Sequence, residues 1–173
     1  MNVVGVEPAE NIKSSVPTIR KFFDSNVAKT IVRQYGKAKL VTATNVFAHI
    51  DNLHGFLSSL DVLLDNDGYF FAQFPDVRNL LSENQFDTIY HEHLSYFTRE
   101  PLHHLFTNSP FEIVEMVHND IHGGSLRLIV KRRHNLVDNF ISNVNKIKED
   151  LRNYLMYEKE KGASIVGFGA AAK

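Results

Sequence analysis

Apolar positions in the first 65 residues recur at helical spacing in two stretches. Between 26 and 35 they fall four residues apart and Gly36 follows directly, so we predict a helix over 26–35. A second apolar stripe, of leucines and one phenylalanine, lies between 53 and 64. Asp51 stands just before this stripe, and aspartate is a favoured N-cap residue, so we predict a second helix that Asp51 caps.

Short runs rich in β-branched or aromatic residues predict strands at 3–6, 39–45 and 68–74. The polar stretch DNDG, 65–68, predicts the turn before the third strand, and 8–14 predict the beginning of a helix. Strands that alternate with helices over short links favour a parallel sheet covered by helices. The fold class that we expect is therefore α/β.

The second half of the chain has a different pattern. Residues 100–109 predict a short helix. Strand-like runs at 111–118 and 125–133 flank a glycine-containing link, which predicts an antiparallel pair at the edge of the sheet. Apolar residues three and four positions apart over 137–161 predict a long amphipathic helix. The last residues, 164–173, predict a strand that runs into a Gly-x-Gly turn.

Composition narrows the classes of partner and compartment. The 173 residues carry a formal net charge of −1, so charge gives no reason to expect a nucleic acid or a membrane as partner. The chain has no cysteine, which excludes disulfides and thiolate nucleophiles and agrees with a cytoplasmic protein. No apolar run approaches the ~20 residues that span a bilayer. The first ten residues lack the basic and apolar regions of a signal peptide.

Polar residues stand at the carboxyl ends of the predicted strands, where ligands of parallel α/β sheets bind. Glu7 follows the first strand, and a carboxylate there can accept both ribose hydroxyls of an adenosine. The alternative is a solvated acid at a helix N-terminus. Asn45 and His49 follow the second strand, where a turn asparagine and a capping histidine are the alternative.

The stretch 86–97, FDTIYHEHLSYF, concentrates titratable side chains, because His91, Glu92 and His93 follow directly on Tyr90. Histidine is the natural general base near neutral pH, and an adjacent glutamate or tyrosine can orient it or polarise a carbonyl. A His-x-His pair can also bind zinc if further ligands join it. A hydrogen-bonded surface cluster is the third alternative. The residues alone leave catalytic, metal-binding and structural roles open.

Two glycine-containing segments complete the candidates. In HGGSLR, 122–127, adjacent glycines let the backbone approach a neighbour closely, and His122 can then reach the same pocket; a plain hairpin turn is the alternative. In GFGAAAK, 167–173, a Gly-x-Gly follows a predicted strand, an arrangement that can cradle phosphate but is short here.

Taken together and in this order, GVEPAENI, NVFAHI, FDTIYHEHLSYF, HGGSLR and GFGAAAK resemble the sugar C-methyltransferase family over nearly the whole chain. Members of that family use S-adenosylmethionine to methylate a carbon of a nucleotide-linked deoxysugar. The resemblance implies an α/β, Rossmann-like methyltransferase sheet, mostly parallel with an antiparallel edge pair and truncated at both ends. It implies a partial methyltransferase domain over 1–133, a connecting helix over 134–162 and the start of a C-terminal α/β domain over 163–173.

The resemblance also implies roles for individual residues. Those expected at the catalytic centre are Tyr90, Glu92, His93 and His49, with His93 as the general base. The expected cofactor-binding residues are Glu7, Asn45 and Val46. The expected substrate-binding residues are His91, His122, Gly123, Gly124 and Ser125. No metal ligand is expected, and Gln73 stands where the resemblance leads us to expect a glutamate.

The implied chemistry begins with a carbon nucleophile. A ketone at C4 of the sugar acidifies the proton at C3, which His93 removes, while Tyr90 or His49 donates a hydrogen bond to the enolate oxygen. Glu92 orients the imidazole or a sugar hydroxyl. The enolate carbon then attacks the sulfonium methyl group in line.

Several departures from the family shape what we expect of the isolated chain. A cysteine-rich zinc module and a first strand with a glycine-rich cofactor loop have no counterpart in this sequence. A sheet without its first strand exposes an edge, so we expect a homo-oligomer or a complementing chain. Two other functions stay open: a metal-dependent enzyme that uses the His91 and His93 pair, and a non-catalytic remnant that binds a sugar nucleotide or a partner chain.

Overall fold

The computed structural model describes residues 2–133 and 136–167, and the chain divides into two compact units, Met1–Arg133 and His134–Lys173. The described part of the second unit is the helix α5 (Leu136–Glu160), which confirms the long helix predicted there, followed by irregular backbone. The prediction of a strand over 164–173 is wrong for 164–167, where the backbone is irregular and pairs with none of the described strands. The predicted Gly-x-Gly turn extends beyond the described residues.

A four-stranded sheet with the order β3-β4-β6-β5 forms the centre of the first unit. Its strands are β3 (Ala38–Thr44), β4 (Leu64–Pro75), β5 (Phe111–Asn119) and β6 (Ser125–Arg132). β3 and β4 run parallel, while β6 is antiparallel to both β4 and β5. The predicted strands at 39–45, 68–74, 111–118 and 125–133 are confirmed, as is the antiparallel arrangement of the last two.

The stretch DNDG is not a separate turn, because β4 already begins at Leu64 and continues through 65–68. The pairing register jumps there, from Ala38 opposite Leu64 to Leu40 opposite Tyr69. The exposed Lys39 ammonium contacts the carboxylates of Asp65 and Asp67 in this segment.

A separate two-stranded parallel sheet contains β1 (Gly5–Val6) and β2 (Thr18–Ile19). β1 confirms the first predicted strand, although its side chains are only half-buried. β2 is too short to show in the sequence pattern. The helix predicted to begin over 8–14 is absent, because the Arg20 guanidinium donates to the carbonyls of Ala9 and Ile12 and holds the segment as a turn.

Helices α1 (Ser25–Tyr35) and α2 (Leu53–Leu63) confirm the two helical stripes. α1 ends at Gly36, whose φ of 82° suits glycine. The N-cap of α2 is Asn52 and not Asp51, because the Asn52 side-chain oxygen accepts the Gly55 N–H at 2.8 Å. The remaining helical elements are η1 (Phe47–His49), α3 (Val77–Ser82), η2 (Phe86–Thr88), α4 (Arg99–Thr107) and η3 (Ile121–Gly123), and α4 confirms the short helix predicted over 100–109.

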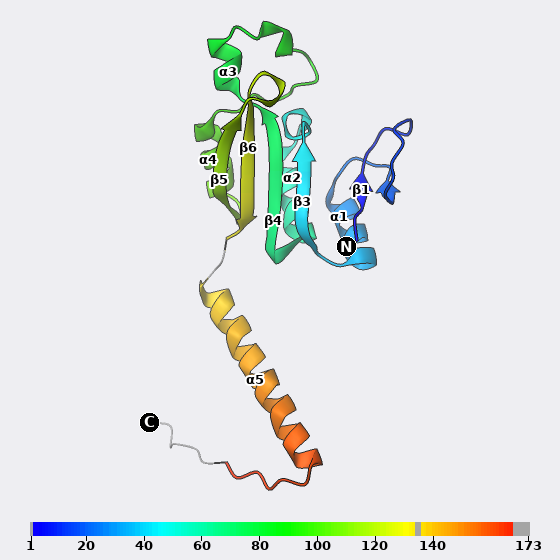
Figure 1. Cartoon of the computed structure of the whole chain (residues 1–173), viewed down its shortest axis with the longest axis vertical. Helices are drawn as coiled ribbons and strands as arrows, with labels where there is room; N and C mark the ends of the chain where they lie inside the picture. Colours follow the sequence, from blue (N-terminus) through cyan, green and yellow to red (C-terminus); the bar gives the residue numbers. More distant parts are fainter. Residues whose placement is uncertain (1, 134–135, 168–173) are drawn as a thin grey trace. The chain divides into compact units, whose positions relative to one another are not determined.

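The main core lies on one face of the four-stranded sheet, where α2 and α4 cover it (Figure 1). Its centre is aromatic: Phe47, Phe70 and Phe74 are fully buried, and the rings of Phe47 and Phe74 stack with 5.4 Å between centroids. Side chains of the opposite face are more accessible, with Leu40 61% exposed and Tyr69 44% exposed.

A second apolar cluster joins α1 to α2 and to both sheets. Its buried members are Val27, Ala28, Ile31 and Leu63, and the half-buried side chains packed against it include Val6, Ile19 and Val41. The two sheets therefore share one layer of helices.

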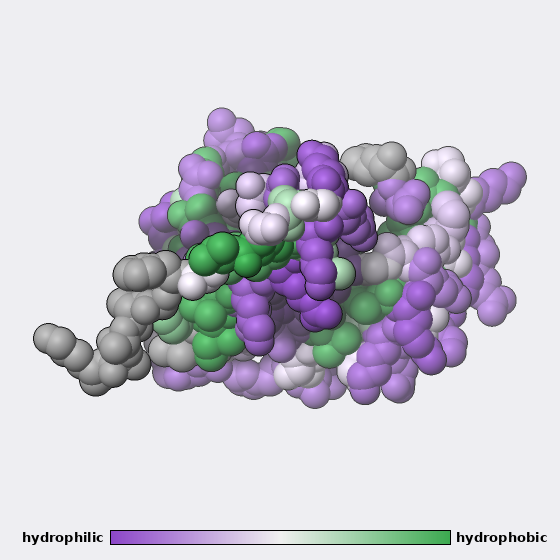
Figure 2. Space-filling model, turned by 90° about the horizontal axis from the view of Figure 1, so that it is seen from below, coloured by the Kyte–Doolittle hydropathy of each residue, from purple (hydrophilic) through white to green (hydrophobic). Residues whose placement is uncertain are grey.

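Apolar side chains also reach the surface elsewhere. Phe22 is 80% exposed and Phe86 is 79% exposed. Figure 2 shows hydrophobic residues in patches among hydrophilic ones on one side of the molecule. Among the described helices, none combines the length and the apolar character that crossing a membrane requires.

Candidate functional site

After η2, the rest of the FDTIYHEHLSYF segment is an irregular loop and not a strand, so alternation does not decide where its side chains point. Two backbone hydrogen bonds, from the N–H groups of Leu94 and Ser95 to the Ala48 carbonyl, tie the loop to η1 at 2.9 and 3.1 Å. Phe97 anchors its far end, because this 6% exposed ring packs against Phe47 and Phe74. The aromatic core thus fixes both the loop and η1 at the carboxyl ends of β3 and β4.

His93 has a hydrogen-bond partner at each ring nitrogen. Its Nδ1 lies 2.9 Å from the Thr88 carbonyl oxygen, and its Nε2 lies 2.9 Å from the Tyr90 hydroxyl. A carbonyl oxygen can only accept, so Nδ1 carries the proton. In the neutral ring Nε2 therefore keeps the lone pair and accepts the Tyr90 O–H, which makes Nε2 the basic atom of the cluster.

His49 lies beside His93, with 4.8 Å between the ring centroids. The same reasoning assigns its tautomer, because Nδ1 lies 2.7 Å from the Glu92 carbonyl oxygen and must donate to it. In neutral His49, Nδ1 therefore carries the proton and Nε2 carries the lone pair. The structure brings together three of the four residues expected at the catalytic centre: His49, Tyr90 and His93.

The side chains of Glu92 and His91 take no part in the hydrogen bonds of this cluster. Glu92 joins the cluster through its backbone carbonyl, while its side chain is exposed. The His91 side chain is exposed as well. Within the described ranges, no three His, Cys, Asp or Glu side chains gather closely enough to hold a metal ion.

The three expected cofactor-binding residues follow the two parallel strands β1 and β3. Glu7 comes directly after β1, and one of its carboxylate oxygens accepts the Ala9 N–H at 2.9 Å. Asn45 follows β3 with a φ of 54°, a left-handed conformation that asparagine tolerates better than most residues. Its neighbour Val46 is 48% exposed.

The HGGS turn uses most of its groups to build the fold. Gly124 has a φ of 109°, and a Cβ there would lie 2.4 Å from Cγ of Asn79. Ser125 is 1% exposed, and its hydroxyl donates to the Ile121 carbonyl at 2.8 Å. His122 is exposed, with a φ of 54°.

The HGGS turn nevertheless connects to the segment that precedes the histidine cluster. The Gln85 side-chain amide donates to the Gly123 carbonyl at 2.6 Å, and Gln85 stands three residues before Thr88. Sequence reasoning missed both residues. Thr88 acts through a backbone carbonyl, which every residue has, so no side-chain signal could have identified it.

Two further polar contacts lie at the same end of the sheet. The 3% exposed Asp76 caps α3 through the Arg78 N–H, and its other oxygen lies 3.3 Å from Nδ1 of His118. Gln73, 6% exposed, accepts from Nε of Arg127 at 3.0 Å. The Gln73 amide oxygen thus accepts the guanidinium N–H as a glutamate oxygen would, but it does not neutralise the positive charge of Arg127.

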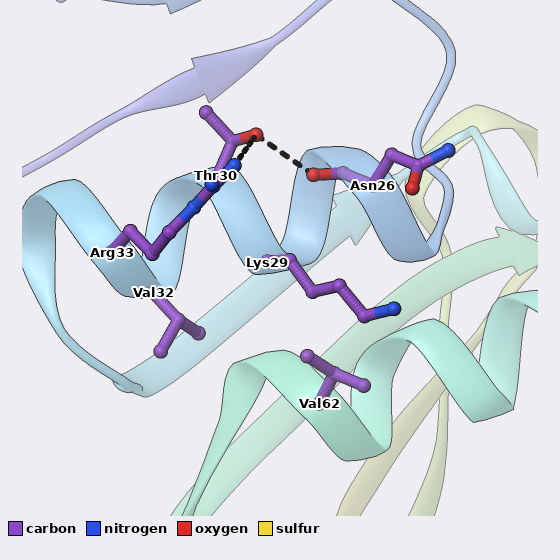
Figure 3. Close-up of a pocket in the computed structure, with 6 residues that line it drawn as sticks. All are labelled: Asn26, Lys29, Thr30, Val32, Arg33 and Val62. Carbon is purple, nitrogen blue, oxygen red and sulfur yellow. Dashed lines mark hydrogen bonds between the residues drawn. The ribbon is translucent and has the colours of Figure 1, made fainter.

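A shallow pocket lies elsewhere, between α1 and α2 (Figure 3). Its volume is about 500 Å³, and its lining residues are Asn26, Lys29, Thr30, Val32, Arg33 and Val62. The Thr30 hydroxyl donates to the Asn26 carbonyl at 2.8 Å, so part of the polar lining is already paired within α1. None of the sequence-predicted site residues lines this pocket.

Comparison with protein families gives a match over most of the first unit. The sequence model of the methyltransferase domain family matches residues 1–116 of the 173. Among characterised proteins, the C-methyltransferase NovU of Streptomyces niveus is 41% identical over 129 residues. The match covers 72% of this chain but only 31% of NovU, so the chain spans about a third of that relative's length.

Solved structures show a similar fold at low sequence identity. An S-adenosylmethionine-dependent methyltransferase from Anabaena variabilis superposes with a TM-score of 0.53 at 16% identity, covering 76% of this chain and 68% of that one. The plantazolicin methyltransferase BpumL, solved with S-adenosylhomocysteine, gives 0.54 at 10% identity and covers 77% and 68%. These similarities show a Rossmann-like α/β fold, as the sequence predicted.

Proposed function

Because the chain belongs to the methyltransferase domain family, we propose that it methylates a carbon atom of a nucleotide-linked keto-deoxysugar with S-adenosylmethionine as methyl donor. The 41% identity to a C-methyltransferase supports carbon as the acceptor. The resemblance of the NVFAHI, YHEH and HGGS segments to sugar C-methyltransferases supports the sugar. The observation that carries the proposal is the basic Nε2 of His93 beside Tyr90 and His49.

The residues proposed to hold the cofactor are Glu7, Asn45 and Val46. One carboxylate oxygen of Glu7 is oriented by the Ala9 N–H, and a carboxylate has further lone pairs that can accept two vicinal hydroxyls, so its chemistry fits a ribose. When bound, the cofactor supplies an electrophilic methyl group. Glu7 and Asn45 each follow the carboxyl end of a strand, β1 and β3, and these two strands point the same way in Figure 1, which supports the proposal.

A carbon atom must lose a proton before it can accept a methyl cation equivalent. In the proposed reaction, His93 Nε2 takes the proton from the carbon next to the sugar ketone and becomes an imidazolium. The Thr88 carbonyl stabilises that cation, because it already accepts the Nδ1–H at 2.9 Å. This second contact also holds the ring so that Nε2 is the atom presented to the substrate.

The electron pair left by the proton moves onto the ketone oxygen, which needs a hydrogen-bond donor. Tyr90 provides one, because its hydroxyl occupies the Nε2 lone pair until substrate arrives and is then free to turn to the enolate oxygen. His49 lies beside it and could be a second donor only as an imidazolium, because in the neutral ring its N–H is bound to the Glu92 carbonyl and Nε2 carries a lone pair. The exposed side chains of His91, Glu92 and His122 and the backbone of Gly123 and Gly124 are proposed to contact the sugar nucleotide.

Solvent exchange tests the base without relying on methyl transfer. The chain is incubated in D₂O with a nucleotide-linked 4-keto-6-deoxysugar, and deuterium at C3 is followed by mass spectrometry and NMR. The expected result is enzyme-dependent exchange that falls by roughly 10²–10⁴-fold in His93→Ala, the usual size of general-base assistance. The matched control is His54→Ala, an exposed histidine on α2, which should exchange at the wild-type rate.

A second measurement in the same sample tests the methyl donor. S-adenosylmethionine labelled in its methyl group is added, and the label is sought on carbon. Exchange that is equally fast in His93→Ala and wild type would remove His93 from the proposal. Exchange without labelled product would keep the base and reject independent methylation by this chain.

A further inference from the structure

Among the described residues, Arg127 is the cation of β6 that lacks a carboxylate partner. Elsewhere on this strand, Lys131 pairs with Glu112 at 3.2 Å, and the Arg132 guanidinium binds an aspartate carboxylate. Nε of Arg127 instead donates to the side-chain amide oxygen of Gln73 at 3.0 Å. An amide oxygen has no formal charge, so the positive charge of Arg127 is not neutralised.

The bond to Arg127 also orients the Gln73 amide. A guanidinium can only donate, so the amide oxygen faces Arg127 and the amide nitrogen points its N–H groups elsewhere. Gln73 is 6% exposed, and its amide nitrogen has no hydrogen-bond partner within the described part of the chain. The terminal nitrogens of the half-buried Arg127 have none there either. The two side chains therefore present N–H donors to a common ligand.

These donors belong to one row of side chains across the sheet. Gln73 of β4 stands opposite Thr44 of β3 on one side and opposite Arg127 of β6 on the other. Ala72 belongs to the main core, and side chains alternate along a strand, so this row lies on the opposite face of the sheet. Thr44 is exposed and adds a hydroxyl to the row. Asn45, a proposed cofactor-binding residue, follows directly.

No described acid compensates Arg127 from the neighbouring strand β5. The residue opposite Arg127 on that strand is Val117. Glu115 is on the same face but stands opposite Ile129, one pair further along, and forms no ion pair with Arg127. The row thus combines a net positive charge with several donors, which is the chemistry that recognises an oxyanion.

We infer that Arg127, Gln73 and Thr44 form a binding site for an oxyanion, either a carboxylate or a phosphate. The planar guanidinium of Arg127 matches two oxygens of such a group, and Gln73 holds it through Nε. The Gln73 amide nitrogen donates to the same group. A glutamate at position 73 would neutralise Arg127 and repel the ligand, so the glutamine is what makes the site.

Binding of an oxyanion depends on this row of side chains and not on the proposed reaction. Only the source of the group rests on the proposed function, whose two reactants each supply one. S-adenosylmethionine carries a carboxylate, and a nucleotide-linked sugar carries phosphates.

Titration with small oxyanions tests the site. Sodium acetate and inorganic phosphate are added separately to the ¹⁵N-labelled full chain at constant ionic strength, and the Arg127 Nε–H and Gln73 amide signals are followed by NMR. We expect saturable shifts of both signals with at least one probe. Tighter binding of acetate would identify a carboxylate ligand, and tighter binding of phosphate would identify a phosphate. Signals that shift with neither probe would overturn the inference.

Gln73→Glu tests the role of the glutamine. This variant should weaken the binding by about tenfold or more, the equivalent of one hydrogen bond to a charged group. The matched control is Lys131→Gln, which removes a cation of the same strand and face that already has its carboxylate, and it should bind as wild type does. Equal binding by Gln73→Glu and wild type would also overturn the inference. The wild-type titration tests the site even if a variant does not fold.

The deuterium-exchange test of His93 is independent of these titrations. A chain that binds neither probe but still exchanges the sugar C3 proton would lose the oxyanion site and keep the proposed function. A chain that binds a probe at Arg127 but shows no exchange would keep the site and lose the function.

Discussion

The histidine cluster and the HGGS turn were both predicted to form the site, yet the structure uses their polar groups in different ways. In the cluster, the backbone supplies the fixed contacts, through the carbonyls of Thr88 and Glu92, and the basic nitrogens of His93 and His49 remain for chemistry. In the turn, the Ser125 hydroxyl and the Gly124 backbone serve the fold.

A reactive polar residue differs from a structural one in its exposure and in its hydrogen-bond partner. Ser125 is 1% exposed and its hydroxyl has its partner four residues away in the chain. Tyr90 is 42% exposed and its hydroxyl bonds a group that can itself change protonation state. The first bond closes a turn, whereas the second can be exchanged for a bond to substrate.

The largest effect on folding is expected at Gly124. Alanine there would have to adopt a φ of 109° and place its Cβ against Asn79, so Gly124→Ala should lower the free energy of unfolding by about 3 kcal/mol. Urea denaturation measures it. The control is Gly36→Ala, where φ is also positive but no atom lies within 4 Å, so only the backbone strain of about 2 kcal/mol is expected. Equal losses would show that packing on Asn79 contributes nothing.

Ser125→Ala should have the next largest effect. The substitution removes the buried hydroxyl and its bond to the Ile121 carbonyl, which still accepts the Gly124 N–H at 3.2 Å, so the free energy of unfolding should fall by roughly 1 kcal/mol. The matched variant is Ser58→Ala, which removes a similar bond to a carbonyl on the exposed side of α2. A smaller loss at Ser125 than at Ser58 would contradict a structural role for the turn.

Tyr90→Phe should do the opposite of these two variants: it should lower the activity and leave the stability nearly unchanged. Its hydroxyl is accessible and bonds His93 rather than the core, so the urea midpoint should hardly move. Exchange at the sugar C3 should fall by roughly 10²-fold, because a donor to the enolate oxygen is lost. A drop in stability with unchanged exchange would place Tyr90 with the structural residues.

The smallest effect is expected for the exposed ion cluster of Lys39, Asp65 and Asp67, which belongs neither to the candidate site nor to the core. The Lys39 ammonium lowers the pKa of Asp65 and Asp67 below the usual 3.8, and these carboxylates in turn raise the pKa of Lys39. Carboxylates with a lowered pKa stabilise the fold above their unfolded pKa, and that contribution is lost as the pH falls through the folded value. The small difference in urea midpoint between wild type and Lys39→Met should therefore vanish between about pH 5 and about pH 2.

Salt provides the control for that titration. All three groups are accessible to solvent, so about 1 M NaCl should remove the same difference at neutral pH. A difference that persists at low pH and in salt would mean that Lys39 contributes through packing of its aliphatic chain.

Periodic segments of this fold were predictable from sequence, and short or irregular ones were not. The stripe over 53–64 and the alternation over 111–118 correspond to α2 and β5, since many residues contribute to each signal. β2 has two residues, and its pairing with β1 depends on the N–H groups of Gly5 and Glu7, which donate to the carbonyls of Pro17 and Ile19. Contacts between distant segments carry no local pattern.

The candidate site shows the same division. The concentration of titratable side chains at 90–93 was visible in the sequence, and the structure does gather Tyr90, His93 and His49. Which nitrogen of His93 is basic depended on the Thr88 carbonyl, and a backbone group leaves no trace in the sequence. The roles of Glu7, Asn45 and the HGGS turn in binding remain predictions.

The tautomer of His93 is the most direct test of the account. Long-range ¹H–¹⁵N correlation of histidine-labelled protein separates the protonated nitrogen from the one with the lone pair, and His93→Ala assigns the signal. We predict that neutral His93 carries its proton on Nδ1, bound to the Thr88 carbonyl, with Nε2 unprotonated. A spectrum in which Nε2 carries the proton would contradict it, because no lone pair would then face Tyr90 and the substrate.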